Sequence, residues 1–197
     1  MRPLHLGGLV CWALATGCVV HDVAAVAPFP YGTQHEAGST QVEARVHYGV
    51  PILQKSFFWD GNGEVDDTGI GLHVSRFIAD DVALGLGTNL VTWWTPGSDV
   101  YSADLEGLLR VYPVHAWPFF IDGITGFQYA SDQIPPGGTV WNFTFGFGGG
   151  LDLSIDDHTS LMIGTLYHHI SNALGRMNDR NPSQNETRFW VGIAWTL

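Results

Sequence analysis

The strongest constraint on the fold is that apolar residues recur in short, evenly spaced segments rather than in one long run. From about residue 40, eight segments rich in Gly, Thr and aromatic residues follow one another. Each is close to or above the roughly 9–11 residues that a tilted transmembrane strand needs. We therefore predict strands at 40–49, 68–78, 82–93, 102–112, 118–129, 139–155, 160–172 and 187–197.

The alternation of side chains indicates what these strands face. Between residues 141 and 147, the odd-numbered positions are all Trp or Phe, whereas the even-numbered positions are Asn, Thr and Gly. One apolar face opposite a small or polar face is typical of a strand that faces lipid on one side. The alternative is a soluble sandwich or lipocalin-like barrel, in which the apolar face points inward.

The connections between the predicted strands alternate in length. They are short after the second, fourth and sixth strands and longer after the others, as in barrels with short periplasmic turns and longer external loops. We therefore predict an all-β fold over residues 40–197, an eight-stranded antiparallel up-and-down transmembrane β-barrel. With a periplasmic N-terminus, the loop after the seventh strand is external. A barrel of this size encloses little free space, so a pore is not expected.

The N-terminal region predicts export. Residues 6–20 form an apolar run of 15 residues after Arg2, which suits a signal peptide and is too short to span a bilayer comfortably. We assign residues 1–25 to the signal peptide, with lipoprotein-type cleavage before Cys18 as an alternative, and residues 26–39 to a linker. Both cysteines, Cys11 and Cys18, lie in this region, so the barrel has no disulfide framework or thiolate metal site.

The charge balance excludes some partners and indicates an unusual surface. The net charge is −11 and only 14% of residues are charged. A nucleic-acid binder that uses a basic face is therefore excluded. An ordinary soluble domain carries about 25% charged residues, so this chain is expected to hide part of its surface from water, in an outer membrane.

The densest polar cluster ends the seventh predicted strand. His168 and His169 face opposite ways and cannot hold one metal ion together, so no metal or cofactor is expected. His169 and Ser171 share a face, which is the pairing that activates a serine nucleophile. Glu186, at the start of the predicted last strand, would orient the imidazole, and the Asn172 amide would help to bind the oxyanion. The alternative is an incidental polar girdle at the membrane interface.

These residues carry a resemblance to a known family. Residues 169–173 (His-Ile-Ser-Asn-Ala), followed by Asn178, Asp179 and residues 180–182 (Arg-Asn-Pro), resemble the lipid A 3-O-deacylases of the PagL type, also called acyloxyacyl hydrolases. Residues 139–144 and 146–150 resemble the hairpin that precedes this motif in the family. The resemblance covers roughly residues 117–197.

The resemblance implies a serine esterase on the lipid-facing wall of an eight-stranded outer-membrane barrel. By this likeness His169 is the general base, Ser171 the nucleophile and Asn172 a residue that activity needs. The implied substrate is an ester-linked acyl chain of lipid A in lipopolysaccharide, among the outer-membrane lipids. The family needs neither a metal nor an organic cofactor.

The acid of the implied triad has three candidates in this chain. The family places a Glu early in the last strand, which fits Glu186 if the preceding loop is a few residues longer. A tighter alignment places Asn185 at that position, and Asp179 inside the loop is a third choice. Ser183 stands where the family commonly has a glycine.

Two other functions are compatible with the same strands. A non-catalytic small barrel, serving as an anchor, adhesin or receptor, needs only the fold. An esterase of the same fold acting on another lipid is the second alternative, because a net charge of −11 does not obviously favour the anionic phosphates of lipid A. The sequence leaves open whether the protein forms a homodimer.

Overall fold

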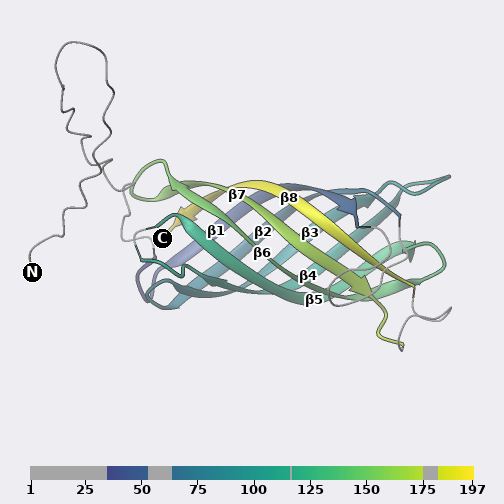
Figure 1. Ribbon diagram of the computed structural model, residues 1–197, viewed down its shortest axis with the longest axis horizontal. Helices are drawn as coiled ribbons and strands as arrows, with labels where there is room; N and C mark the ends of the chain where they lie inside the picture. The colour runs from purple at the N-terminus through teal and green to yellow at the C-terminus, as the bar shows by residue number, and fades with distance from the viewer. Residues whose placement is uncertain (1–34, 53–63, 116, 175–181) are drawn as a thin grey trace, which may run out of the picture.

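The chain forms one closed antiparallel barrel, as the computed structural model shows for residues 35–52, 64–115, 117–174 and 182–197 (Figure 1). Each strand pairs with the next along the chain, and the last pairs with the first. The strands are β1 (Thr40–Pro51), β2 (Asp67–Ala79), β3 (Val82–Trp93), β4 (Val100–Val111), β5 (Phe119–Ile134), β6 (Thr139–Ser154), β7 (Thr159–Ser171) and β8 (Ser183–Thr196). The predicted fold class is confirmed. In the described residues, no helix is long and apolar enough to cross a membrane.

The observed strands differ from the predicted ones mainly at one end of the barrel. β8 begins at Ser183 rather than at residue 187, and β5 continues to Ile134 rather than ending at 129. The end that carries both termini has the turns β2–β3, β4–β5 and β6–β7, and the other end has the longer connections (Figure 1). The predicted signal peptide, 1–25, and residues 26–34 of the predicted linker lie outside the described residues.

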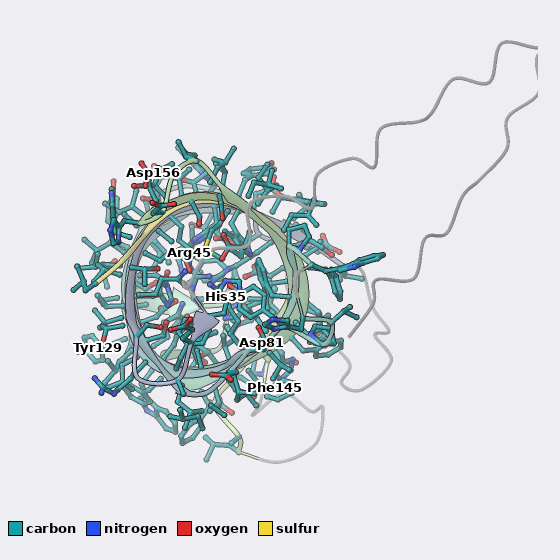
Figure 2. The ribbon with its side chains drawn as sticks, turned by 90° about the vertical axis from the view of Figure 1, so that its left-hand side faces the viewer. His35, Arg45, Asp81, Tyr129, Phe145 and Asp156 are labelled. Carbon is teal, nitrogen blue, oxygen red and sulfur yellow. The ribbon has the colours of Figure 1, made fainter. Side chains whose placement is uncertain are left out.

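The wall alternates as the sequence pattern predicts, with its apolar face outward. On β6, Phe143 and Phe145 are exposed while Asn142 and Thr144 are buried. Viewed along the barrel from the end with the termini, Arg45 lies inside the ring of strands and Tyr129 outside it (Figure 2). The soluble alternative, which needs the opposite orientation, is therefore wrong. An apolar outer face is what a lipid bilayer requires of a barrel.

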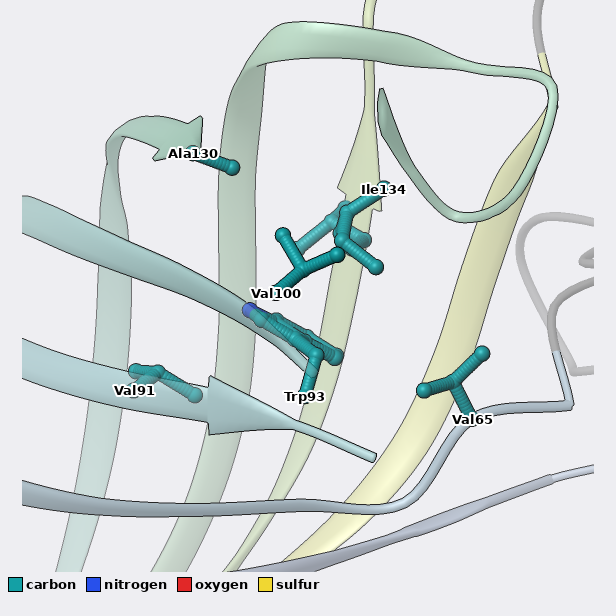
Figure 3. Packing of buried hydrophobic residues seen from close by; sticks show 7 residues of the cluster. Val65, Val91, Trp93, Val100, Ala130 and Ile134 are labelled. Carbon is teal, nitrogen blue, oxygen red and sulfur yellow. The ribbon is translucent and has the colours of Figure 1, made fainter. Parts of the chain in front are cut away.

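Side chains fill the barrel at both ends. At the end with the longer connections, an apolar cluster packs across the opening and is formed by Val65, Val91, Trp93, Val100, Ala130, Ile134 and Ile170 (Figure 3). At the end with the termini, a second cluster is formed by Phe77, Ala83, Tyr112, Phe120, Met162, Trp190 and Ala194. These two clusters obstruct the opening at each end of the barrel.

Between the two apolar clusters lies a layer of paired charges. Arg110 binds Asp122 through two hydrogen bonds of 2.8 Å and reaches Glu43 at 3.0 Å. Arg188 Nε lies 2.7 Å from Glu186 Oε1. Buried charges are tolerated when they are paired with an opposite charge, as both arginines are. A cavity of about 10 Å³ beside Arg188 has roughly the room of one water molecule.

Two inward-facing glycines make space for buried histidines. A Cβ atom at Gly69 would overlap the His47 ring, and one at Gly87 would overlap the His73 ring. Any larger residue at these positions would displace the histidine. The polar interior therefore depends on small residues on neighbouring strands as well as on charge pairing.

Candidate active site

The two adjacent histidines of β7 lie on opposite sides of the wall, as predicted. His168 is fully buried inside the barrel. His169 and Ser171 share the outward face, because side chains alternate along a strand. Ser171 is the last residue of β7, so both side chains lie at the end of the barrel that carries the longer loops.

The register of β7 against β8 brings Asn185 to His169. These residues are direct partners in the sheet, and Ser171 is paired with Ser183 in the same way. Asn185 Oδ1 lies 2.6 Å from His169 Nδ1 and accepts a hydrogen bond of 2.7 Å from the Tyr167 hydroxyl. An amide oxygen can only accept, so the His169 proton is on Nδ1. The lone pair of His169 is therefore on Nε2, the nitrogen a general base uses.

Glu186 does not contact His169, and the expectation that it would is wrong. Its side chain points into the barrel, where Oε1 lies 2.6 Å from His168 Nδ1 and 2.7 Å from Arg188 Nε. Gln184 donates a further hydrogen bond of 3.0 Å to Oε2. The physical reason is the strand periodicity. Because β8 already includes Asn185 and Glu186, these two neighbours must face opposite sides of the wall.

Asn172 shapes the chain just beyond Ser171. Its Oδ1 accepts a hydrogen bond of 3.0 Å from the Leu174 backbone N–H, and Asn172 itself is buried. Ala173 between them has a φ of 57°, a left-handed conformation that is uncommon for alanine. The observed bond uses the amide oxygen of Asn172, whereas the predicted oxyanion role would use its amide N–H. That predicted role is not tested by this contact. Asp179, the third candidate for the acid, lies outside the described residues.

Apolar and backbone groups surround the outward-facing cluster. On the β6 side, Phe143 is the sheet partner of Ser171 and Phe145 that of His169. The rings of Phe147 and Tyr167 lie 5.1 Å apart. A lipid chain beside Ser171 would therefore rest on a row of exposed aromatic side chains.

On the other side of the cluster, the Ile52 backbone N–H donates a hydrogen bond of 2.7 Å to the Asn185 backbone oxygen. Asn185 is fully buried, and His169 is 7% exposed. The polar atoms of the cluster thus sit in a setting from which water is largely excluded, where each contact is stronger than in water.

The arrangement differs from a standard serine triad in one respect. Asn185 can fix the orientation and tautomer of His169, but its neutral amide does not balance the positive charge that a general base acquires. Sequence reasoning considered Asn185 and overlooked Tyr167. The available signal for Tyr167 was its spacing, because a residue two positions before His169 must share its face.

Comparison with known proteins defines the class of barrel. No family model matches the sequence, and no curated protein matches it. Among solved structures, the chain is similar to the outer membrane protein OprG from Pseudomonas aeruginosa, with 16% identity and a TM-score of 0.50 over 84% of this chain and 99% of that one. It is also similar to Neisserial surface protein A, with 12% identity and a TM-score of 0.59 over 81% and 99%.

At these identities the likeness concerns the fold. The chain has the fold of the eight-stranded β-barrels of the bacterial outer membrane, which supports the predicted localisation. In such barrels the longer loops lie outside the cell, and the outward-facing cluster on β7 and β8 lies at the end of the barrel that carries the longer loops.

Proposed function

We propose that this protein is an outer-membrane serine esterase that removes an ester-linked acyl chain from lipid A. The observation that carries the proposal is the contact of 2.6 Å between His169 Nδ1 and Asn185 Oδ1, with Ser171 on the same outward face. The sequence around these residues resembles the PagL-type lipid A deacylases, which supports the same assignment. Lipid A lies in the outer leaflet, so its esters would reach Ser171 without leaving the bilayer.

In the proposed reaction, the acyl chain is transferred first to Ser171 and then to water. Ser171 Oγ attacks the ester carbonyl carbon while its proton passes to His169 Nε2. The bond to the leaving alcohol then breaks, and the imidazolium gives its proton to the alcohol oxygen. Water attacks the acyl-serine with the same proton transfers, which releases the fatty acid and restores the Ser171 hydroxyl.

Asn185 and Tyr167 are the positioning residues of this proposal. Asn185 holds the His169 ring, and the Tyr167 hydroxyl holds the Asn185 oxygen at 2.7 Å. A histidine oriented by asparagine also serves papain-like proteases, so a neutral orienting group is compatible with acyl transfer. The aromatic residues of β6 provide an apolar surface for the acyl chain that is removed.

The decisive experiment compares matched variants on purified lipopolysaccharide. We expect Ser171→Ala and His169→Asn each to reduce fatty-acid release by about a thousandfold or more, as for other serine hydrolases. Thr165→Ala is the control, because Thr165 faces outward on the same strand but lies four residues before His169. All variants should keep the heat-modifiable migration of a folded barrel on gels. Full activity in both site variants would exclude this site.

A second candidate function is a non-catalytic surface barrel. The neutral Asn185 favours it, because the carboxylate nearest in sequence, Glu186, is committed to contacts inside the barrel. The wild-type protein would then release no fatty acid from lipopolysaccharide or from phospholipid vesicles. Release from phospholipid alone would instead identify an esterase of the same fold with another lipid substrate.

A further inference from the structure

The outer wall carries an elongated groove away from the candidate active site. It consists of two adjoining hollows of about 560 and 660 Å³, which share Val46, Ile70 and Leu90 as lining residues. These three side chains face outward on β1, β2 and β3, and Ile70 and Leu90 are 58% and 59% exposed. The groove therefore lies on the surface that contacts membrane lipid.

The groove runs from the outer membrane interface towards the middle of the bilayer. Its outer hollow is lined by Thr68, Thr92 and Tyr101, which lie next to the longer loops. Its deeper hollow includes Leu72 on the same strand as Thr68. The four steps from Thr68 to Leu72 correspond to about 13 Å of strand, so the groove extends along β2 from its outer end.

The deeper hollow exists because one small side chain stands between large ones. Ala44 on β1 is paired with Leu72 on one side and Ile193 on the other. Thr88, the neighbour of Leu72 on β3, is also short. The larger side chains beside these positions form the walls. This part of the groove is lined almost entirely by hydrocarbon, which suits a flexible apolar chain.

The outer rim has hydroxyl groups and no positive charge among the described lining residues. Thr68, Thr92 and Tyr101 offer neutral donors and acceptors, and Tyr101 is 60% exposed. Arg45 contributes to the deeper hollow, but its guanidinium group bonds to His73 inside the barrel. This rim suits a neutral ester or amide group and offers no cation for a phosphate.

We propose that the groove is a binding site for one fatty acyl chain of an outer-leaflet lipid, with its ester or amide linkage at Thr68, Thr92 and Tyr101. The chain descends past Ile70 to Ala44. A hydrocarbon chain is narrow enough to enter the groove, whereas a second barrel would first meet protruding side chains such as Leu86, which is 66% exposed. This inference does not depend on the proposed esterase activity.

The test is native mass spectrometry of the full-length protein extracted from outer membranes in a mild detergent. We expect the wild type to retain one lipid. Ala44→Trp, which fills the groove, should reduce the retained fraction at least tenfold. Thr88→Trp is a second groove variant in case the first folds poorly. Leu105→Trp is the control, because Leu105 is the sheet partner of Thr88 and exposed, but does not line the groove.

The possible results distinguish a lipid from a second copy of the protein as the occupant of the groove. Loss of lipid in a groove variant, with retention in Leu105→Trp, supports the acyl-chain site. Equal lipid retention in all variants, or a wild type that carries no lipid, overturns it. A photoreactive amino acid at Leu90 should crosslink to a lipid. A crosslinked species of twice the protein mass would instead identify a second copy as the occupant and would also overturn the proposal.

Discussion

His168 and His169 are neighbours on β7, but one has a charged partner inside the barrel and the other a neutral partner on the outer side. Each contacts a residue of β8 at 2.6 Å, Glu186 inside the barrel and Asn185 outside it. Inside, the Glu186 carboxylate also lies 2.7 Å from Arg188 Nε, so its negative charge is paired with a cation. Outside, the partner is a neutral amide fixed by a tyrosine. The difference shows that a membrane-facing wall can orient a histidine without placing a buried charge beside lipid, where charge is costly.

The largest expected effect tests whether the inner contact is structural. Glu186→Ala removes the nearest carboxylate of Arg188 and His168, and loss of one partner of a buried ion pair typically costs about 3–5 kcal/mol. Arg188 keeps Asp67 and Asp104 at 3.6 and 3.8 Å, so we expect a loss at the lower end of that range. Asn185→Ala should cost only about 1 kcal/mol of unfolding free energy. Urea unfolding in lipid vesicles, followed by gel migration, measures both. Similar losses in the two variants would remove the distinction between the inner and outer histidine.

The next prediction changes the outer contact into a copy of the inner one. Asn185→Asp supplies a carboxylate that stabilises the protonated His169 during acyl transfer. In a serine triad the opposite change costs about 10⁴-fold, so we expect ester hydrolysis to rise about tenfold or more. Fatty-acid release at a fixed enzyme concentration is the measurement. A decrease, with the barrel still folded, would show that charge at this position is harmful to the proposed reaction.

A smaller effect is expected from the tyrosine that holds Asn185. Tyr167→Phe removes the hydrogen bond of 2.7 Å but keeps the ring beside Phe147. The loss of about 1 kcal/mol corresponds to roughly a fivefold decrease in kcat with little change in KM. If Tyr167→Phe lowers KM and kcat together or leaves both unchanged, Tyr167 does not position the site.

The smallest expected effect is a change in stability caused by a carboxylate that is fully exposed to water. It serves as a comparison for the buried Glu186. Backbone N–H groups of His158 and Thr159 lower the pKa of Asp156 in the turn between β6 and β7. Its stabilising contribution is therefore present above about pH 4, the ordinary Asp value, and is lost as the pH falls through the lowered pKa. Asp156→Asn should reduce stability slightly at neutral pH and not at pH about 2. Unfolding curves at both pH values provide the check.

The strand pattern predicted the wall better than it predicted the outer end of β8. Apolar alternation identified β6 and β7 and placed His168 and His169 on opposite faces, because lipid-facing residues give a strong signal. Ser183, Gln184 and Asn185 are all polar, so this stretch resembles a loop in the sequence although it is paired with β7. Because of this error, Glu186 was predicted to lie on the same side of the wall as His169. The outward-facing positions of this stretch, Ser183 and Asn185, are as polar as the inward-facing ones, so no alternation of hydropathy marks the strand.

For the same reason, the sequence pattern did not predict the charged interior. Asp67 looks like a loop residue, yet it is the first residue of β2 and accepts a hydrogen bond from His47 at 2.9 Å inside the barrel. Its burial depends on a partner 20 positions away in sequence, which no local pattern reveals. The residues Ser171 and His169, by contrast, are close in sequence, and a spacing of two was sufficient to place them on one face.

The alternation along β7 and β8 also bears on how such a protein can change over generations. Only every second residue is in contact with lipid, and the intervening residues hold the barrel together. Substitutions at Asn185, which orients His169, can therefore alter the chemistry of the candidate site while the ion pair of Glu186 continues to support folding. A deletion of one residue in either strand would exchange the two sets of side chains at once. New activities on this wall can therefore arise by point substitution, whereas a small insertion or deletion would disrupt both faces of the strand.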